Sequence, residues 1–142
     1  AMHHDFDCTA FGYPHGKVPG MEVVAFPADE NLIRLAFAAA EAVNAGHTKI
    51  GRVASGDQFV ADPALKDKII SVSNALCTEM EGAAIAHTAH RNGVPFVILR
   101  AISDKADNSA EMDYPSFEKL AAHRCAEVTT ALAAALVQEC NG

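Results

Sequence analysis

The chain has 142 residues, half of them apolar, and a formal net charge of −7. This length suits one domain that buries about two-thirds of its unfolded surface. The acidic balance and the scattered positions of the eleven basic residues exclude a nucleic-acid or anionic-membrane surface, which requires clustered Lys and Arg. No run of about 20 continuous apolar residues predicts a membrane span, and no signal peptide is recognisable.

The cysteines and histidines predict neither a disulfide framework nor a metal site. No Cys-x-x-Cys pair occurs among Cys8, Cys77, Cys125 and Cys140. We therefore expect free thiols in a reducing cytoplasm. His3 and His4 fall in an irregular segment, and His87 and His90 are an i, i+3 pair that would need further ligands to hold a metal. No metal and no cofactor is expected.

Taken in chain order, four predicted helices alternate with three predicted strands. Residues 1–28 are punctuated by Gly and Pro and are expected to be irregular. Asp29 is expected to cap the first helix, and Asp62-Pro63 opens the second. The predicted helices span residues 29–46, 62–70, 81–92 and 114–139. The predicted strands span residues 49–55, 75–78 and 94–102.

This order predicts one α/β domain over residues 1–142, with a parallel or mostly parallel sheet and helices on its faces. The hydrophobic run of residues 94–102 is typical of a strand buried on both faces. Glu81 follows one predicted strand and Asp104 follows another. Ligands bind beyond the carboxyl ends of such strands, so two carboxylates at one rim are a candidate site.

Residues 55–60, Ser-Gly-Asp-Gln-Phe-Val, follow a predicted strand. Gly56 would let the backbone approach a ligand closely, and Phe59 could lie flat against a planar ring. An ordinary turn whose Phe drops into the core is the alternative, and these residues alone favour it.

The carboxylates have alternatives as well. Glu81, in the first turn of a helix, is favoured by the helix dipole and could accept hydrogen bonds from the vicinal hydroxyls of a ribose. Dipole complementarity alone also explains one Glu. Arg100 lies inside an apolar strand and must have a partner. Asp104 is either a general acid oriented by Ser103, which requires it to hold a proton near neutral pH, or a turn residue.

Together these segments resemble the bacterial 5′-methylthioadenosine/S-adenosylhomocysteine nucleosidases, of the purine nucleoside phosphorylase and uridine phosphorylase superfamily. They occur in family order over nearly the whole chain. The matching stretches are residues 9–13 with 19–20, 55–59, 79–81 with 84–87, 94–97 and 100–104. The resemblance implies a three-layer α/β/α fold with a mostly parallel central sheet.

The resemblance also implies hydrolysis of the bond between adenine and a 5′-thio-substituted ribose, through an oxocarbenium-like state. The products are adenine and a 5-thioribose. Asp104 would give a proton to N7 of adenine, and Ser103 would hold Asp104. The implied substrate-binding residues are Phe59 stacking on adenine, Val60 reading the base edge through its backbone, Glu81 gripping the ribose hydroxyls, Met80 packing on the sugar, and Glu79.

The resemblance places three further residues at the periphery of the implied substrate site. Tyr114 stands where the family usually has a Phe lining the pocket for the thio substituent. Phe11 and Pro19 match positions that the family contributes across a dimer interface, so a homodimer is implied.

Family members carry a further N-terminal part, with a Glu that activates the attacking water, before the segment that matches Ala1. We therefore expect the C-terminal portion of such an enzyme, with little activity alone and a separate N-terminal segment as one partner. A phosphate-dependent purine nucleoside phosphorylase and a non-catalytic adenosine-binding fragment are the alternatives.

Overall fold

The computed structural model describes the backbone of residues 1–102 and 114–141, and the side chains of residues 1–102 and 119–139. Its strands are β1 (Met2–His3), β2 (Val53–Ser55) and β3 (Cys77–Glu79). Its helices are α1 (Glu30–Val43), α2 (Pro63–Ser73), α3 (Gly82–Arg91) and α4 (Tyr114–Asn141), with one 3-10 turn, η1 (Thr9–Phe11).

The three strands form one parallel sheet in the order β1-β2-β3. The register aligns Met2 with Ala54 and His3 with Ser55, and then Ala54 with Thr78 and Ser55 with Glu79. All three carboxyl ends therefore meet at one edge. The parallel sheet predicted from the sequence is confirmed.

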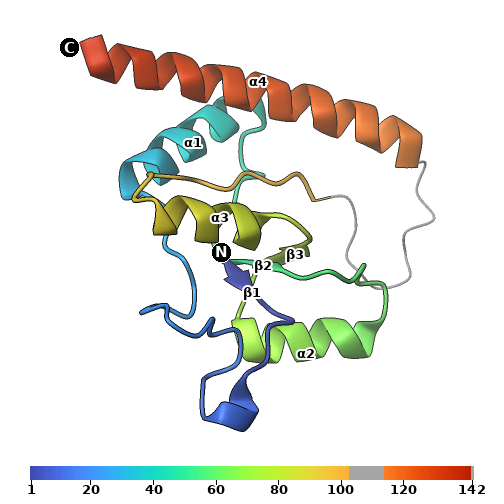
Figure 1. Cartoon of the computed structure of the whole chain (residues 1–142). Coiled ribbons are helices and arrows are strands. Elements are labelled where there is room, and N and C mark those ends of the chain that lie inside the picture. Colours follow the sequence, from blue (N-terminus) through green and yellow to red (C-terminus); the bar gives the residue numbers. More distant parts are fainter. Residues whose placement is uncertain (103–113, 142) are drawn as a thin grey trace.

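Helices cover both faces of this sheet. Side chains alternate between the faces of a strand, and in β2 the fully buried Ala54 packs with Ile69 of α2. The hydroxyl of the next residue, Ser55, instead accepts a hydrogen bond from the Ala83 amide of α3. Figure 1 shows α2 on one side of the sheet and α3, followed by α1 and α4, on the other. This layering confirms the predicted α/β/α fold class.

Helix α4 lies along α1 as the outermost element (Figure 1). Leu35, Ala36 and Ala39 of α1 form a buried cluster with Leu132 of α4. Within the described residues, the stretch Lys119–Glu139 is long and apolar enough to cross a membrane by length and composition, and little of it is buried. The contacts of α4 with α1 are made through Leu132 and its partly buried neighbours.

The helix boundaries follow the predicted local signals. Asp29 caps α1 by accepting a hydrogen bond from the Leu32 amide at 2.9 Å, and Asp62 caps α2 through the amides of Ala64 and Leu65. Gly93, with φ of +64°, follows the end of α3.

The strand predictions need correction. β2 is confined to its last three predicted residues, and β1 lies in the segment expected to be irregular. Residues 94–102 form no strand, and Val94, Leu99 and Ile102 are 55%, 38% and 59% exposed, so burial on both faces is wrong. A strand exists only through a paired neighbour, whereas helix signals are local. The described backbone hydrogen bonds of this segment go to helices instead: the Val94 amide donates to the Ala89 carbonyl, and the Phe96 carbonyl accepts from the Asp29 amide.

Candidate functional site

A cavity of about 490 Å³ opens at the carboxyl ends of β2 and β3. Pockets for small organic ligands commonly have this size. Five predicted site residues line it, namely Phe59, Val60, Glu79, Met80 and Glu81. The rest of the wall comes from Gln58, from α2, from β3 and the residues before it, and from residues 100–102. The sheet edge named from the sequence is thus where the candidate site lies.

Phe59 and Met80 are exposed apolar side chains of the cavity wall, as are Ile70, Leu76 and Ile102. Phe59 is 75% exposed and Met80 is 43% exposed. The alternative of a turn whose Phe enters the core is therefore wrong for Phe59. Val60, at 7% exposure, instead joins the buried cluster with Ala54 and Ile69. The cavity consequently offers a free aromatic ring on a backbone anchored by its neighbour.

Helix α2 supplies a wall that the sequence reasoning missed. Lys66, Ile69 and Ile70 line the cavity from successive turns. Their i, i+3 and i+4 spacing was a usable signal, because residues at these intervals share one face of a helix.

The two glutamates have different environments. The side chain of Glu79 is 5% exposed and accepts hydrogen bonds from the backbone amides of Glu81 and Gly82. The side chain of Glu81 is 61% exposed and, although Glu81 is the N-cap of α3, makes no capping hydrogen bond. Glu79 therefore does the capping, and the carboxylate of Glu81 is open to the cavity.

Arg100 joins the two carboxylates. Its guanidinium lies 3.5 Å from Oε2 of Glu79 and 3.4 Å from Oε2 of Glu81. The expectation that this arginine must have an acidic partner is confirmed, although it does not lie in a strand. The arrangement places one cation between a buried and an exposed carboxylate at the cavity wall.

Ser55 was singled out only as part of a motif, and the structure gives it specific contacts. Its hydroxyl donates to Oε1 of Glu79 and accepts from the Ala83 amide at 2.7 Å. The register of β2 with β3 brings these groups together. The sequence spacing between residues 55 and 79 does not predict this contact.

Three predicted residues have no described side chain. Ser103 and Asp104 lie outside the described residues, and Tyr114 is described only as the first backbone position of α4. Ala101 and Ile102, which immediately precede Ser103 in the chain, line the cavity.

Phe11 and Pro19 are not part of the cavity wall. Both are exposed, Phe11 by 81%, and both belong to the N-terminal segment of the chain. The structure therefore does not bring them together with Phe59 within one copy of the chain.

Among the described cysteines, one belongs to the cavity wall. The described cysteines Cys8, Cys77 and Cys125 are free, and Cys77 lines the cavity. Burial, with a smaller contribution from the charge of Glu79, raises the pKa of the Cys77 thiol. Within the described residues, no group of three His, Cys, Asp or Glu side chains is arranged to hold a metal ion.

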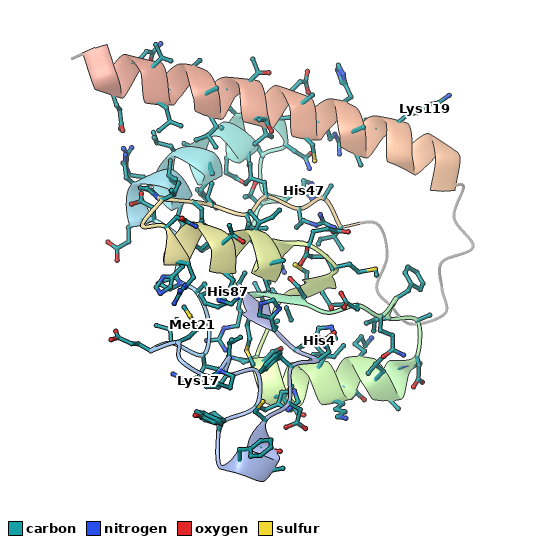
Figure 2. The ribbon with its side chains drawn as sticks, viewed as in Figure 1. His4, Lys17, Met21, His47, His87 and Lys119 are labelled. Carbon is teal, nitrogen blue, oxygen red and sulfur yellow. The ribbon has the colours of Figure 1, made fainter. Side chains whose placement is uncertain are left out.

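An aromatic cluster lies under α3 beside β1. His87 of α3 stacks on Phe26 with a ring separation of 4.7 Å, and His3 meets both rings edge-on. Figure 2 shows His87 next to β1. Burial first, and then the neighbouring His87, lower the pKa of His3. The cluster thus favours a neutral imidazole in the folded chain.

Comparison with known proteins gives consistent matches. The family model of the Phosphorylase superfamily matches residues 1–136. The 5′-methylthioadenosine/S-adenosylhomocysteine nucleosidase of Geobacillus sp. (strain WCH70) is 39% identical over 95% of this chain, which spans 58% of that protein. The chain therefore covers little more than half the length of this relative.

Comparison with solved structures finds similar folds in related enzymes. The 5′-methylthioadenosine/S-adenosylhomocysteine nucleosidase of Neisseria meningitidis, in complex with methylthio-immucillin-A, superimposes with a TM-score of 0.83 and 38% identity over 93% of this chain and 57% of that one. The futalosine hydrolase of Helicobacter pylori superimposes with a TM-score of 0.79 and 35% identity, over 93% and 56%. The resemblance drawn from the motifs is confirmed, and the chain belongs to the phosphorylase superfamily.

Proposed function

We propose that the cavity binds the base and ribose of a 5′-thio-substituted adenosine, and that the protein to which this chain belongs hydrolyses the N-glycosidic bond of 5′-methylthioadenosine and S-adenosylhomocysteine. The observation that carries the proposal is that Phe59, Met80 and Glu81 line one cavity at the carboxyl ends of parallel strands. The names of the similar proteins support the same chemistry.

Each described group suits one part of such a substrate. The exposed ring of Phe59 offers a stacking surface for adenine, since aromatic rings favour offset stacking. The exposed carboxylate of Glu81 can accept hydrogen bonds from both vicinal hydroxyls of the ribose. Met80 supplies an adaptable apolar contact for the sugar, and the backbone of Val60 would read the base edge.

The reaction breaks the bond from N9 of adenine to C1′ of the sugar, and water adds to C1′. The bonding electrons pass into the adenine ring, which is a poor leaving anion unless N7 receives a proton. Asp104, held by Ser103, is the proposed donor of that proton. Asp104 follows the cavity-lining Ile102 by two residues in the chain. No metal or cofactor is needed for these steps.

The remaining parts of the proposal concern what lies around this cavity. Tyr114 is proposed to line the pocket for the thio substituent, and Phe11 and Pro19 to complete the pocket of the partner in a homodimer. We place the protein in the cytoplasm and treat residues 1–142 as one domain. The group that activates the water is proposed to lie in the part of the relatives that the chain does not span, so the chain alone should turn over little.

Adenine release from methylthioadenosine, measured with the purified chain, tests the proposal. Asp104→Asn is the test variant, and each reaction is run with and without a second polypeptide that spans the rest of a relative's length. We expect release only with the second polypeptide, and loss of that release in the Asn variant.

Full release by the chain alone would contradict the need for a second part. Release that depends on added phosphate would identify a phosphorylase instead. Binding of methylthioadenosine without release in any mixture would identify a non-catalytic adenosine-binding module, and an unchanged rate in Asp104→Asn would remove the proposed acid.

A further inference from the structure

We infer that Glu79 is a positioning residue rather than a substrate ligand: its carboxylate fixes the start of α3 and Arg100, and through Arg100 it orients Glu81 toward the ribose. The inference rests on the proposed function, because it takes Glu81 as the group that contacts the ribose hydroxyls. It reassigns one residue that the resemblance places among the substrate contacts.

The carboxylate of Glu79 has no acceptor site left for a substrate. A carboxylate offers about four lone-pair sites. Oε1 accepts from the Ser55 hydroxyl and from the Gly82 amide at 2.9 Å. Oε2 accepts from the amides of Glu81 at 3.1 Å and Gly82 at 2.8 Å and faces Arg100 at 3.5 Å. With 5% of the side chain exposed, a ribose hydroxyl would have to displace one of these partners.

Ser55 extends the same network to the next amide of α3. Its hydroxyl donates to Glu79 and accepts from the amide of Ala83 at 2.7 Å. The first amides of a helix have no partner within the helix. Here Glu79 and Ser55, from neighbouring strands, satisfy those of Gly82 and Ala83. The start of α3 is therefore fixed to the sheet rather than by its own N-cap residue.

This arrangement leaves Glu81 free to face a ligand. Glu81 occupies the N-cap position, where the usual Ser, Thr, Asp or Asn bonds back to the helix amides. It makes no such bond and lies 3.4 Å from the guanidinium of Arg100 instead. The planar fork of Arg100 contacts both carboxylates, so the buried Glu79 anchors one side and the other side holds Glu81.

Space around the network is restricted. A Cβ atom added at Gly82 would lie 3.0 Å from Oε1 of Glu79 and 3.2 Å from Cγ2 of Ile98. Glycine at this position thus permits the close approach of the carboxylate to the helix.

A double-mutant cycle with Glu81 tests the inference by the affinity for methylthioadenosine, measured calorimetrically on the full chain. We expect Glu79→Gln to lower the affinity about tenfold, the usual scale for one charge-assisted contact. The loss should vanish in a Glu81→Gln background, because Glu79 acts through Glu81. It should also vanish for a 2′,3′-dideoxy analogue of the ligand. Losses that multiply in the double variant would show direct contact and overturn the inference.

Ser55 gives a second variant that leaves both glutamates in place. Ser55→Ala is expected to weaken binding with the same dependence on Glu81, and Ser55→Thr, which keeps a hydroxyl, should restore it. An affinity that falls equally in Ser55→Ala and Ser55→Thr would contradict the role of the hydroxyl.

Amide hydrogen exchange tests the network without any ligand. Glu79→Gln should speed exchange at Gly82, and Ser55→Ala should do so at Ala83, by about tenfold or more. Glu81→Gln, the matched control, should leave both amides unchanged. If the wild-type chain binds no thioadenosine, the proposed function fails for this chain and exchange alone decides the role of Glu79. Unchanged exchange in Glu79→Gln would overturn that role.

Discussion

At the scale of single residues, the site combines one exposed ring with one exposed carboxylate, and each has a buried residue close by in the chain. Phe59 is exposed while Val60 is buried, and Glu81 is exposed while the side chain of Glu79 is buried. In both pairs the buried residue fixes the backbone, and the exposed one can contact a ligand without losing core packing.

Phe59→Ala is therefore expected to lower affinity without lowering stability. Loss of a stacked ring should weaken binding of methylthioadenosine about tenfold or more, since stacking contributes about 1–3 kcal/mol per base. The midpoint of urea unfolding should stay unchanged, because 75% of the residue is already exposed. Phe37→Ala, at another exposed Phe, is the control and should leave affinity unchanged. Equal affinity of Phe59→Ala and the wild type would remove Phe59 from the site.

The lowered pKa of His3 predicts acid sensitivity. Because the pKa of His3 in the folded chain lies below its unfolded value of 6.5, the unfolded chain binds the proton more readily. The free energy of unfolding is therefore unaffected above pH 6.5, and it decreases as the pH falls from 6.5 through the folded pKa. The charged and titratable groups near His3 are His87, His4, Asp5 and Asp57; the two acids oppose the shift.

Thermal unfolding at pH 7.5 and pH 5.5 checks this expectation. His3→Gln should lose less stability than the wild type between the two values, whereas the exposed His47→Gln should behave like the wild type. The comparison stops at pH 5.5, because hydrogen bonds lower the pKa of Asp7, Glu41 and Glu139 and those carboxyls titrate at more acidic pH. The same pH dependence in His3→Gln and the wild type would exclude His3 as its source.

At the scale of elements, the helices and the parallel sheet were predictable, whereas the extents of the strands were not. Helix boundaries are set by local hydrogen bonds and backbone angles. Asp29 and Asp62-Pro63 mark the starts of two helices, and Gly93 marks the end of a third. Strand formation depends instead on which segment of the chain lies alongside. This decides the extent of β2, the two residues of β1 and the unpaired segment 94–102. The same distinction applies to the site. Local sequence motifs identified Phe59 and Glu81, whereas the contacts of Ser55 depend on the register between β2 and β3.

The N-cap of α2 should carry a measurable part of the stability of the cavity wall. Asp62→Ala removes the acceptor for two helix amides, at 3.2 and 3.3 Å, and should lower the free energy of unfolding by about 0.5–1 kcal/mol. Asp67→Ala, an exposed Asp in the same helix, should change it by less than about 0.5 kcal/mol. Equal changes in the free energy of unfolding, measured by urea titration of the two variants, would show that the cap does not stabilise the helix.

At the scale of the whole molecule, two apolar clusters among the described side chains hold the layers together. One joins α2 to β2 around Ala54, Val60 and Ile69, and the other joins α1 to α4 around Leu132. Only the first cluster borders the cavity. Binding and the docking of α4 should therefore respond to different substitutions.

Leu132→Ala is expected to loosen α4 while sparing the site. Truncation of this side chain, 8% exposed, should lower the free energy of unfolding by about 2 kcal/mol, the low end for a buried leucine. Leu120→Ala, in the same helix at 48% exposure, should cost less than about 0.5 kcal/mol. Affinity for methylthioadenosine should be the same in both variants at temperatures where both are folded. A selective loss of affinity in Leu132→Ala would contradict the separation of the two clusters.

The position of Cys77 has a practical consequence for chemical probing. Its thiol lines the cavity, and burial keeps it protonated at neutral pH, so alkylating reagents should modify the exposed Cys125 first. A molecule seated in the cavity would cover the remaining approach to Cys77. The rate at which Cys77 is alkylated under mildly alkaline conditions would then report occupancy of the cavity, without a chromophore on the ligand or any turnover.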